Sequence, residues 1–227
     1  EVKHELILQE TLRNLYDGMP ILEIDKALII SARTLVEQDP NYTYATARFL
    51  LRTLYTEALD FLELPTAVYT NNHAGVYHHY FQHYIKRGVA LELLDPQLRS
   101  FDLEKLGKAL LPERDQQFTY LSLQTLYDRY FLHADDVRFE LPQAFFMRIA
   151  MGLAQQESNK EDRAIEFYQL LSSFDYMAST PTLFNAGTLR PQLSSCFLTT
   201  VADDLDQIYS AIKDNALLSK FAGGLGN

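Results

Sequence analysis

The feature that most constrains the fold is a change of pattern at Ser179. Up to about residue 175, apolar residues recur at helical spacing, as in "YATARFLLRTLYTEALDFL" and "PQAFFMRIAMGLAQQ". Beyond Ser179, Thr, Pro, Asn and Gly replace that spacing and predict a polar loop. The run "CFLTTV" (196–201) then predicts a buried strand, and "DDLDQIYSAIKDNALLSK" predicts an amphipathic helix. We therefore expect a mainly α chain that ends in the first strand-helix unit of an α/β domain.

The first 62 residues predict a cluster of three helices. A stripe of leucines near the 3.6-residue period indicates the first helix: Leu6, Leu8, Leu12 and Leu15. The segments "YDGMP" and "DPNYT" break the pattern, because glycine favours turns and proline bars helix continuation. Residues 66–175 also predict helices, with one short strand over "VRFEL" (137–141).

Composition limits the classes of function. The 227 residues are 47% hydrophobic, enough for a packed core, and the net charge of -10 argues against a partner with a phosphate backbone. No apolar run reaches the roughly 20 residues of a membrane span. One cysteine fits a reducing compartment, which predicts a cytoplasmic protein. The start at Glu1 and the stop within "FAGGLGN" predict a piece of a longer protein.

A group of histidines raises the question of a metal site. His78, His79 and His83 lie close together, with His73 upstream, and His79 and His83 are spaced i, i+4. No cysteine lies nearby to complete a ligand set, and tyrosines and a phenylalanine interleave. We predict an aromatic helix and no metal.

The lone thiol, Cys196, lies in "STPTLFNAGTLRPQLSSCFL", a stretch rich in hydroxyl groups. A free cysteine can be a small buried apolar residue, whereas a redox role requires a second sulfur from outside this chain. The hydroxyls around it either satisfy turns or bind a hydroxyl-rich ligand such as a sugar. The residues alone leave both questions open.

Two further patterns flank the last predicted helix. In "ADDLD" (202–206), Asp203 is the predicted N-cap, although a carboxylate there could also accept ribose hydroxyls. The cluster "GGLG" (223–226) predicts a helix C-terminus. It is no phosphate loop of the Gly-Lys-Ser/Thr kind, because Lys220 precedes it.

Taken together, "PTLFNAGTLRPQLSSCFL", "DDLDQIYSAI" and "ALLSKFAGGLG" resemble the large subunit of ribonucleotide reductase, nearly continuously from Ser179 to Gly226. The opening stretch "LYDGMPILEIDKALIISARTLVEQDPNYTYATARFLL" resembles the helical part of an ATP-cone. The resemblance implies three regions: an ATP-cone-like helical remnant (1–62), a helical N-terminal domain (63–178), and the start of a ten-stranded α/β barrel (179–227).

The resemblance also implies a chemistry and the residues that carry it. The family reduces ribonucleoside diphosphates through a thiyl radical and a redox-active cysteine pair, of which Cys196 matches one member. Thr180 and Ser195 match positions that hold the substrate, and Gly224 lies where the backbone approaches it. The positions that match the effector site are Asp203, Asp204, Leu205 and Lys220. A strand start would place the thiol over a barrel mouth, where reacting groups collect.

The implied partners follow from class I enzymes. They are a ribonucleoside diphosphate, dNTP or ATP effectors, a second large subunit in a homodimer, a small radical-bearing beta subunit, and thioredoxin or glutaredoxin. The radical cofactor would belong to the small subunit, and none would bind this chain directly. The fragment alone would be inactive, because the radical cysteine lies later in the family's barrel. The alternatives are an adenosylcobalamin-dependent reductase, a stand-alone nucleotide-binding regulatory module and a helical interaction scaffold.

The cone departs from the family pattern. Its basic, glycine-containing hairpin is missing at the N-terminus. Ile21 and Asp25 stand where Thr and His would contact a nucleotide, and Glu57 stands where a lysine would be. An acid that faces a triphosphate weakens binding. We therefore expect a degenerate or incomplete cone, such as a second, silent copy.

Overall fold

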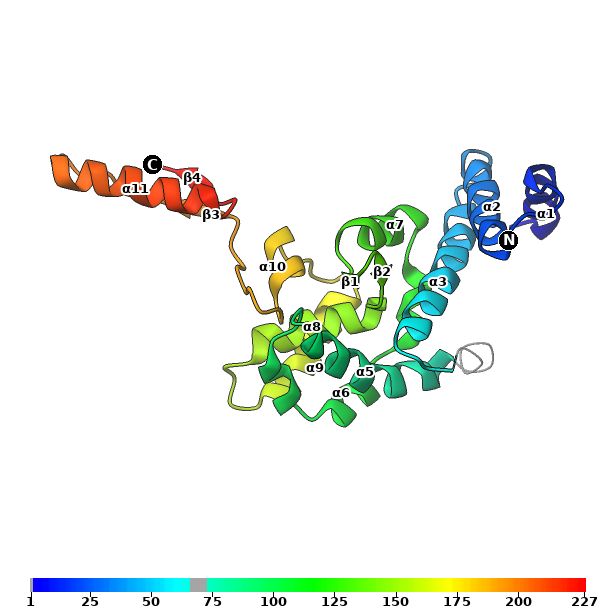
Figure 1. The fold of residues 1–227 in the computed structure, drawn as a ribbon, viewed down its shortest axis with the longest axis horizontal. Coiled ribbons are helices and arrows are strands. Elements are labelled where there is room, and N and C mark those ends of the chain that lie inside the picture. The colour runs from blue at the N-terminus through cyan, green and yellow to red at the C-terminus, as the bar shows by residue number, and fades with distance from the viewer. Residues whose placement is uncertain (1, 66–72) are drawn as a thin grey trace.

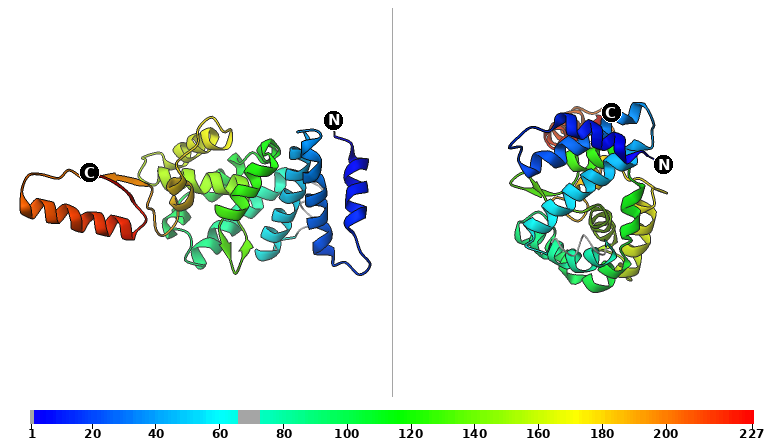
Figure 2. Two further views of the ribbon diagram at one scale, coloured as in Figure 1. Left: turned by 90° about the horizontal axis from the view of Figure 1, so that it is seen from above. Right: turned by 90° about the vertical axis from the view of Figure 1, so that its right-hand side faces the viewer.

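The computed structural model describes residues 2–65 and 73–227, and helices make up most of it (Figure 1). A helical body is followed by one small parallel strand-helix-strand unit that lies apart from it in Figure 1 and in the left view of Figure 2. This confirms the predicted mainly α chain with an early α/β unit. Within the described residues, no helix is both long and apolar enough to cross a bilayer.

Three helices open the chain: α1 (His4–Asn14), α2 (Ile21–Thr34) and α3 (Tyr42–Phe61). A 3-10 turn, η1 (Leu35–Glu37), follows α2. The leucine stripe indicated the helix but does not form its buried face, because Leu8 and Leu12 are 57% and 58% exposed and α1 buries Ile7 and Thr11 instead. The Thr11 hydroxyl donates to the Ile7 carbonyl at 2.7 Å, so this polar side chain is buried without losing its hydrogen bond.

The helix α3 contributes to two separate apolar clusters. Its first residue, Tyr42, packs with Ile7, Ala32 and Leu35 in a small N-terminal cluster. Farther along, Leu54 and other residues of α3 belong to the large core of the helical body. The helix α3 ends at Phe61, so the predicted boundary between residues 62 and 63 lies just after a helix that belongs to both clusters.

The helical body is built around α8 (Pro142–Ala154), whose residues are all buried except Gly152 and Leu153. Pro142 occupies the first turn, as its missing N–H allows. The surrounding helices are α5 (His73–Ala90), η2 (Pro96–Ser100), α6 (Leu103–Ala109), η3 (Pro112–Gln117), α7 (Tyr120–Arg129) and α9 (Lys160–Ser172).

A small hairpin precedes α8. Strand β1 (His133–Ala134) pairs antiparallel with β2 (Val137–Arg138) through a turn in which Asp135 and Asp136 have positive φ. The strand predicted over 137–141 is thus shorter than expected. Its remaining residues, Phe139 to Leu141, are buried as they lead into α8.

The segment predicted as a loop after Ser179 begins with a short helix, α10 (Thr180–Asn185). The prediction of a loop was wrong here because Ser179 occupies the N-cap and Pro181 fits the first turn, where no intrahelical N–H bond is lost. Residues 186–195 are irregular and lead to the C-terminal unit.

The C-terminal unit consists of β3 (Cys196–Leu198), α11 (Leu205–Lys220) and β4 (Gly224–Gly226). The two strands are parallel, and Cys196 is paired with Gly224. The strand predicted over 196–201 is present, but β3 is three residues long and Leu198 is 92% exposed, so its expected length and burial were wrong. The glycine cluster does more than end a helix, since residues 224–226 form β4.

Candidate functional site

The structure brings three of the predicted site residues together at the start of β3. Ser195 Oγ lies 3.3 Å from the exposed Cys196 Sγ. The Gly224 N–H donates to the Ser195 carbonyl at 2.6 Å. A Cβ at Gly224 would lie 3.4 Å from the sulfur and 3.2 Å from that carbonyl oxygen. The missing side chain at Gly224 therefore leaves one side of the thiol open.

The thiol does not lie at the end of the strand where parallel barrels place their reacting groups. Cys196 is the first residue of β3, so it lies at the amino end of the strand. In barrels of eight parallel strands, the reacting groups lie at the carboxyl ends. The rule therefore gives no support to the assignment of Cys196, and the support comes from its neighbours.

Thr180 occupies a different place from the thiol. It begins α10, and its hydroxyl lies 3.3 Å from the Tyr130 hydroxyl. The helix α10 is connected to the thiol through hydrogen bonds to the segment that precedes it. The Thr182 hydroxyl donates to the Leu193 carbonyl at 3.1 Å, and the Asn185 amide donates to the Gln192 carbonyl at 2.7 Å. The helix α10 thus holds the segment that leads directly to Ser195.

The predicted effector residues lie at both ends of α11. Asp204, rather than the predicted Asp203, is the N-cap, and its carboxylate accepts from Gln207 N–H at 3.0 Å. Asp204 takes this place because it is extended and immediately precedes Leu205, where the helix begins. Lys220 ends the helix, which at 1.5 Å per residue is about 24 Å long. One chain therefore does not bring Lys220 beside Asp203, Asp204 and Leu205.

Sequence reasoning missed a buried ion pair beneath α10. Arg148 on α8 donates through Nε to Glu140 Oε1 at 2.7 Å, and both side chains are fully buried. Burial lowers the pKa of Arg148, but the Glu140 carboxylate outweighs it, so the pKa is raised overall. The signal was available: one arginine interrupts the apolar run "AFFMRIAM".

Of the three residues that depart from the ATP-cone pattern, one lies at the surface and two form contacts within the fold. Ile21 is 80% exposed, and Asp25 forms an ion pair with Arg52. Glu57 accepts from the Tyr127 hydroxyl at 2.8 Å and from the Arg138 N–H at 2.6 Å. Glu57 therefore connects α3 to α7 and β2.

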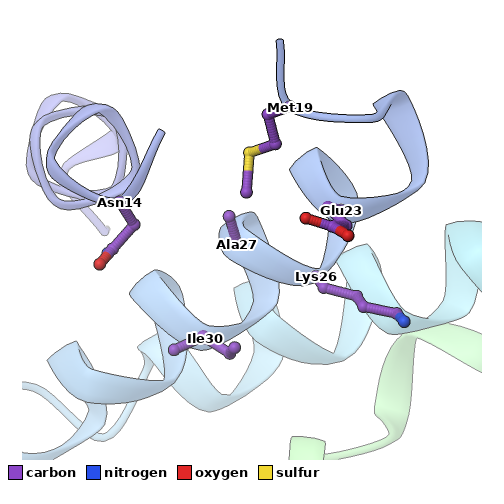
Figure 3. A pocket seen from close by; sticks show the side chains of 6 residues that line it. All are labelled: Asn14, Met19, Glu23, Lys26, Ala27 and Ile30. Carbon is purple, nitrogen blue, oxygen red and sulfur yellow. The ribbon is translucent and has the colours of Figure 1, made fainter. Parts of the chain in front are cut away.

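A hollow of about 380 Å³ lies between α1, the following turn and α2 (Figure 3). Its lining carries one cation and one carboxylate, and that carboxylate, on Glu23, accepts from Tyr16. The lining residues are Asn14, Met19, Glu23, Lys26, Ala27 and Ile30. Their charges cancel, so the hollow offers no surplus of positive charge to a triphosphate.

The predicted histidine group lies on α5. The rings of His79 and His83 are 4.8 Å apart between centroids, and His73 begins the helix. Across residues 2–65 and 73–227, no three His, Cys, Asp or Glu side chains are placed to hold a metal ion together.

Comparison with known proteins identifies the family. Residues 116–191 match the model of the ribonucleotide reductase all-alpha domain, and residues 194–227 match that of its barrel domain. The chain is 46% identical over 223 residues to the ribonucleoside-diphosphate reductase subunit alpha of Chlamydia muridarum (strain MoPn / Nigg), covering 98% of this chain and 21% of the relative.

Two other relatives are more distant. The subunit alpha of Helicobacter pylori (strain ATCC 700392 / 26695) is 40% identical over 92% of this chain and 25% of its own length. The large subunit of Monkeypox virus is 33% identical over 97% of this chain and 27% of its own length. The chain thus spans about a fifth to a quarter of these relatives. It belongs to the family of ribonucleotide reductase large subunits, of which it carries all-alpha domain sequence and the first unit of the barrel domain.

Proposed function

We propose that the protein containing this chain reduces ribonucleoside diphosphates, with Cys196 as one member of a redox-active cysteine pair. The observation that carries the proposal is the group of Cys196, Ser195 and Gly224. An exposed thiol lies beside a hydroxyl, and a glycine strand leaves one side open. The names of the relatives, ribonucleoside-diphosphate reductases, support this chemistry.

The proposed step uses two thiols as the reductant. The ribose loses its 2′-hydroxyl as water and gains a hydrogen at C2′. Cys196 and its partner thiol give up two electrons and two protons and form one S–S bond. The second sulfur must come from outside this chain, because Cys196 is its only cysteine. Thioredoxin or glutaredoxin then reduces the disulfide and restores the pair.

Other residues would bind ligands. Ser195 would donate to or accept from the substrate beside the thiol, and Thr180 would contribute a second hydroxyl from α10. We assign Asp203, Asp204, Leu205 and Lys220 to binding of a dNTP or ATP effector. Because the two ends of α11 are about 24 Å apart, one effector could contact both groups only across two copies of the chain. This favours a homodimer of large subunits.

The remaining partners follow from the family. The name "subunit alpha" implies a second type of subunit, which favours a class I enzyme with a small radical-bearing beta subunit over the adenosylcobalamin-dependent alternative. The radical cofactor would lie on that subunit. For the cone-like region we propose no ATP binding, because the hollow beside α2 carries balanced charges and Asp25 and Glu57 already have partners.

The test replaces the thiol in the full-length protein, assayed with its small subunit and thioredoxin. Cys196→Ser should reduce multiple-turnover reduction to background without changing the melting temperature, because the side chain is exposed. Ser158→Ala, another exposed small-residue change, is the matched control and should keep full turnover. After one turnover without reductant, peptide mapping should find Cys196 in a disulfide. Normal turnover by Cys196→Ser would refute the assignment.

A further inference from the structure

We propose that Arg148 is a positioning residue, which sets α10 and the segment after it and thereby places Thr180 and Ser195 for the substrate. The inference rests on the proposed function, because it concerns how those two side chains are held. Arg148 touches neither of them. It acts through backbone carbonyl groups of the segment that connects them.

The guanidinium of Arg148 caps the C-terminus of α10. Its Nη1 donates to the Ala186 carbonyl at 2.7 Å and approaches that of Phe184 at 3.4 Å, and Nη2 donates to that of Leu183 at 3.2 Å. The last carbonyls of a helix have no partners within it, and a cation there also interacts favourably with the negative end of the helix dipole. A fully buried arginine thus satisfies carbonyl groups that would otherwise be buried without hydrogen bonds.

The other edge of the same guanidinium is fixed by Glu140. Its Nε and Nη2 donate to the two carboxylate oxygens at 2.7 and 3.3 Å. Glu140 is held in turn by the Tyr84 hydroxyl and by the Leu132 N–H, which donates to Oε2 at 2.9 Å. Through Arg148 and Glu140, the position of α10 is therefore fixed relative to α5 and α8, two helices of the main core.

The hydrogen bonds continue from the capped helix to the thiol. Asn185, the last residue of α10, donates to the Gln192 carbonyl, and Thr182 donates to that of Leu193. Two residues farther along is Ser195, whose carbonyl accepts from Gly224. Each step from Arg148 to Cys196 is thus a hydrogen bond or a short piece of backbone.

A close approach of two backbones brings the same segment onto α8. A Cβ at Gly152, one turn after Arg148, would lie 2.2 Å from the Gly187 nitrogen. Gly187 has φ +76°, and a Cβ there would lie 2.7 Å from the Arg148 carbonyl oxygen. Residues 186–187 are therefore seated on the turn of α8 that carries Arg148.

The test must separate positioning from folding. In the full-length protein, the double variant Glu140→Leu/Arg148→Met removes the ion pair together with its charges. Replacing a buried ion pair with apolar groups of similar size often preserves the fold. The carbonyls of α10 nevertheless lose their cap. We expect KM for the ribonucleoside diphosphate to rise at least about tenfold, since each hydrogen bond to a charged group is strong.

A second variant tests the next link without touching the core. Asn185→Ala removes the exposed hydrogen bond to Gln192, and KM should rise about threefold or more with the melting temperature unchanged. Gln124→Ala is the matched control, because it removes an exposed side-chain amide bond on α7. It should leave KM unchanged.

Hydrogen exchange gives a readout that does not need activity. In the double variant, the amides of Leu183 and Ala186 should lose protection, whereas those in the middle of α8 and α9 should keep it. Wild-type KM and wild-type exchange of α10 in the folded double variant would overturn the inference. If the unmodified full-length protein has no reductase activity, the proposed function fails, and the exchange of α10 still decides whether Arg148 holds this segment.

Discussion

The helices α8 and α11 meet opposite surroundings in the same chain. Nearly every residue of α8 is buried, including an arginine and a glutamine, whereas Ala211 is the one buried residue of α11. The helix α11 exposes large apolar side chains, among them Leu205 at 68% and Tyr209 at 64%. Burial of apolar area stabilises a fold, so changes in α8 should alter stability. Changes around α11 should alter function with little effect on stability.

The largest effect on stability should come from Gly152→Ala in α8. The added Cβ would meet backbone of residues 186 and 187, including an atom at 2.2 Å, and backbone cannot move aside cheaply. We expect a loss of about 3 kcal/mol in the free energy of unfolding, measured by urea denaturation.

The matched control is Gly107→Ala in α6, where the nearest atom to the new Cβ is the His78 carbonyl oxygen at 3.4 Å. Since alanine favours helix over glycine, this variant should gain up to about 1 kcal/mol. Equal effects of the two variants would contradict the close approach at Gly152.

The next largest effect on stability should come from Asp115, a buried carboxylate that forms no ion pair within the described residues. It accepts from the Tyr55 hydroxyl at 2.6 Å, the Tyr77 hydroxyl at 2.8 Å and the Gln143 amide at 2.7 Å. Burial raises its pKa to about 6, although these hydrogen bonds oppose the rise. The folded protein therefore holds the Asp115 proton more tightly than the unfolded chain does.

Asp115 therefore makes the folded state less stable as the pH rises. The stabilisation from protonated Asp115 is complete below its unfolded pKa of 3.8 and is lost as the pH rises through about 6. The loss amounts to about 2 to 3 kcal/mol. Asp115→Asn cannot titrate, so the stability of the wild type relative to this variant should fall by that amount between pH 4 and pH 7. Urea titrations across this range would measure it, and a constant difference would exclude the shift.

The smallest effect should appear at the start of α11. Asp204→Ala removes the side-chain acceptor of Gln207 N–H and should cost the first turn about 1 kcal/mol. Faster hydrogen exchange in that turn would reveal it. Asp203→Ala should leave the exchange unchanged, because the cap is Asp204. The opposite result would return the cap to Asp203, the residue that the sequence favoured.

The sequence predicts the elements well and their faces less well. Proline and glycine punctuation located the breaks after α1 and α2, and the change at Ser179 located the end of the helical body. The leucine stripe on α1 did not identify its buried face, because Leu8 and Leu12 match the helical period as well as Ile7 and Thr11 do. Periodicity identifies a helix, but the neighbouring helices determine which face is buried.

The candidate site, like the fold, could be predicted only in part. The order of the motifs pointed to Ser195, Cys196 and Gly224, and the parallel register of β3 and β4 brings them together. That register depends on a crossover through α11, which no local pattern specifies. The burial of Arg148 could have been predicted from the apolar run around it, but its role could not, because that role depends on the backbone carbonyls of residues 183, 184 and 186.

The helix α3 is uninterrupted and contributes to both apolar clusters. At 20 residues it is a stiff rod of about 30 Å. One end is clamped by Ile7 and Leu35, and Tyr55 and Glu57 are anchored to Asp115, Tyr127 and the backbone of β2. A rotation of α1 and α2 would therefore be transmitted to the helical body, because α3 contains no break that could act as a hinge. The N-terminal helices and the core must turn together unless α3 itself bends or melts.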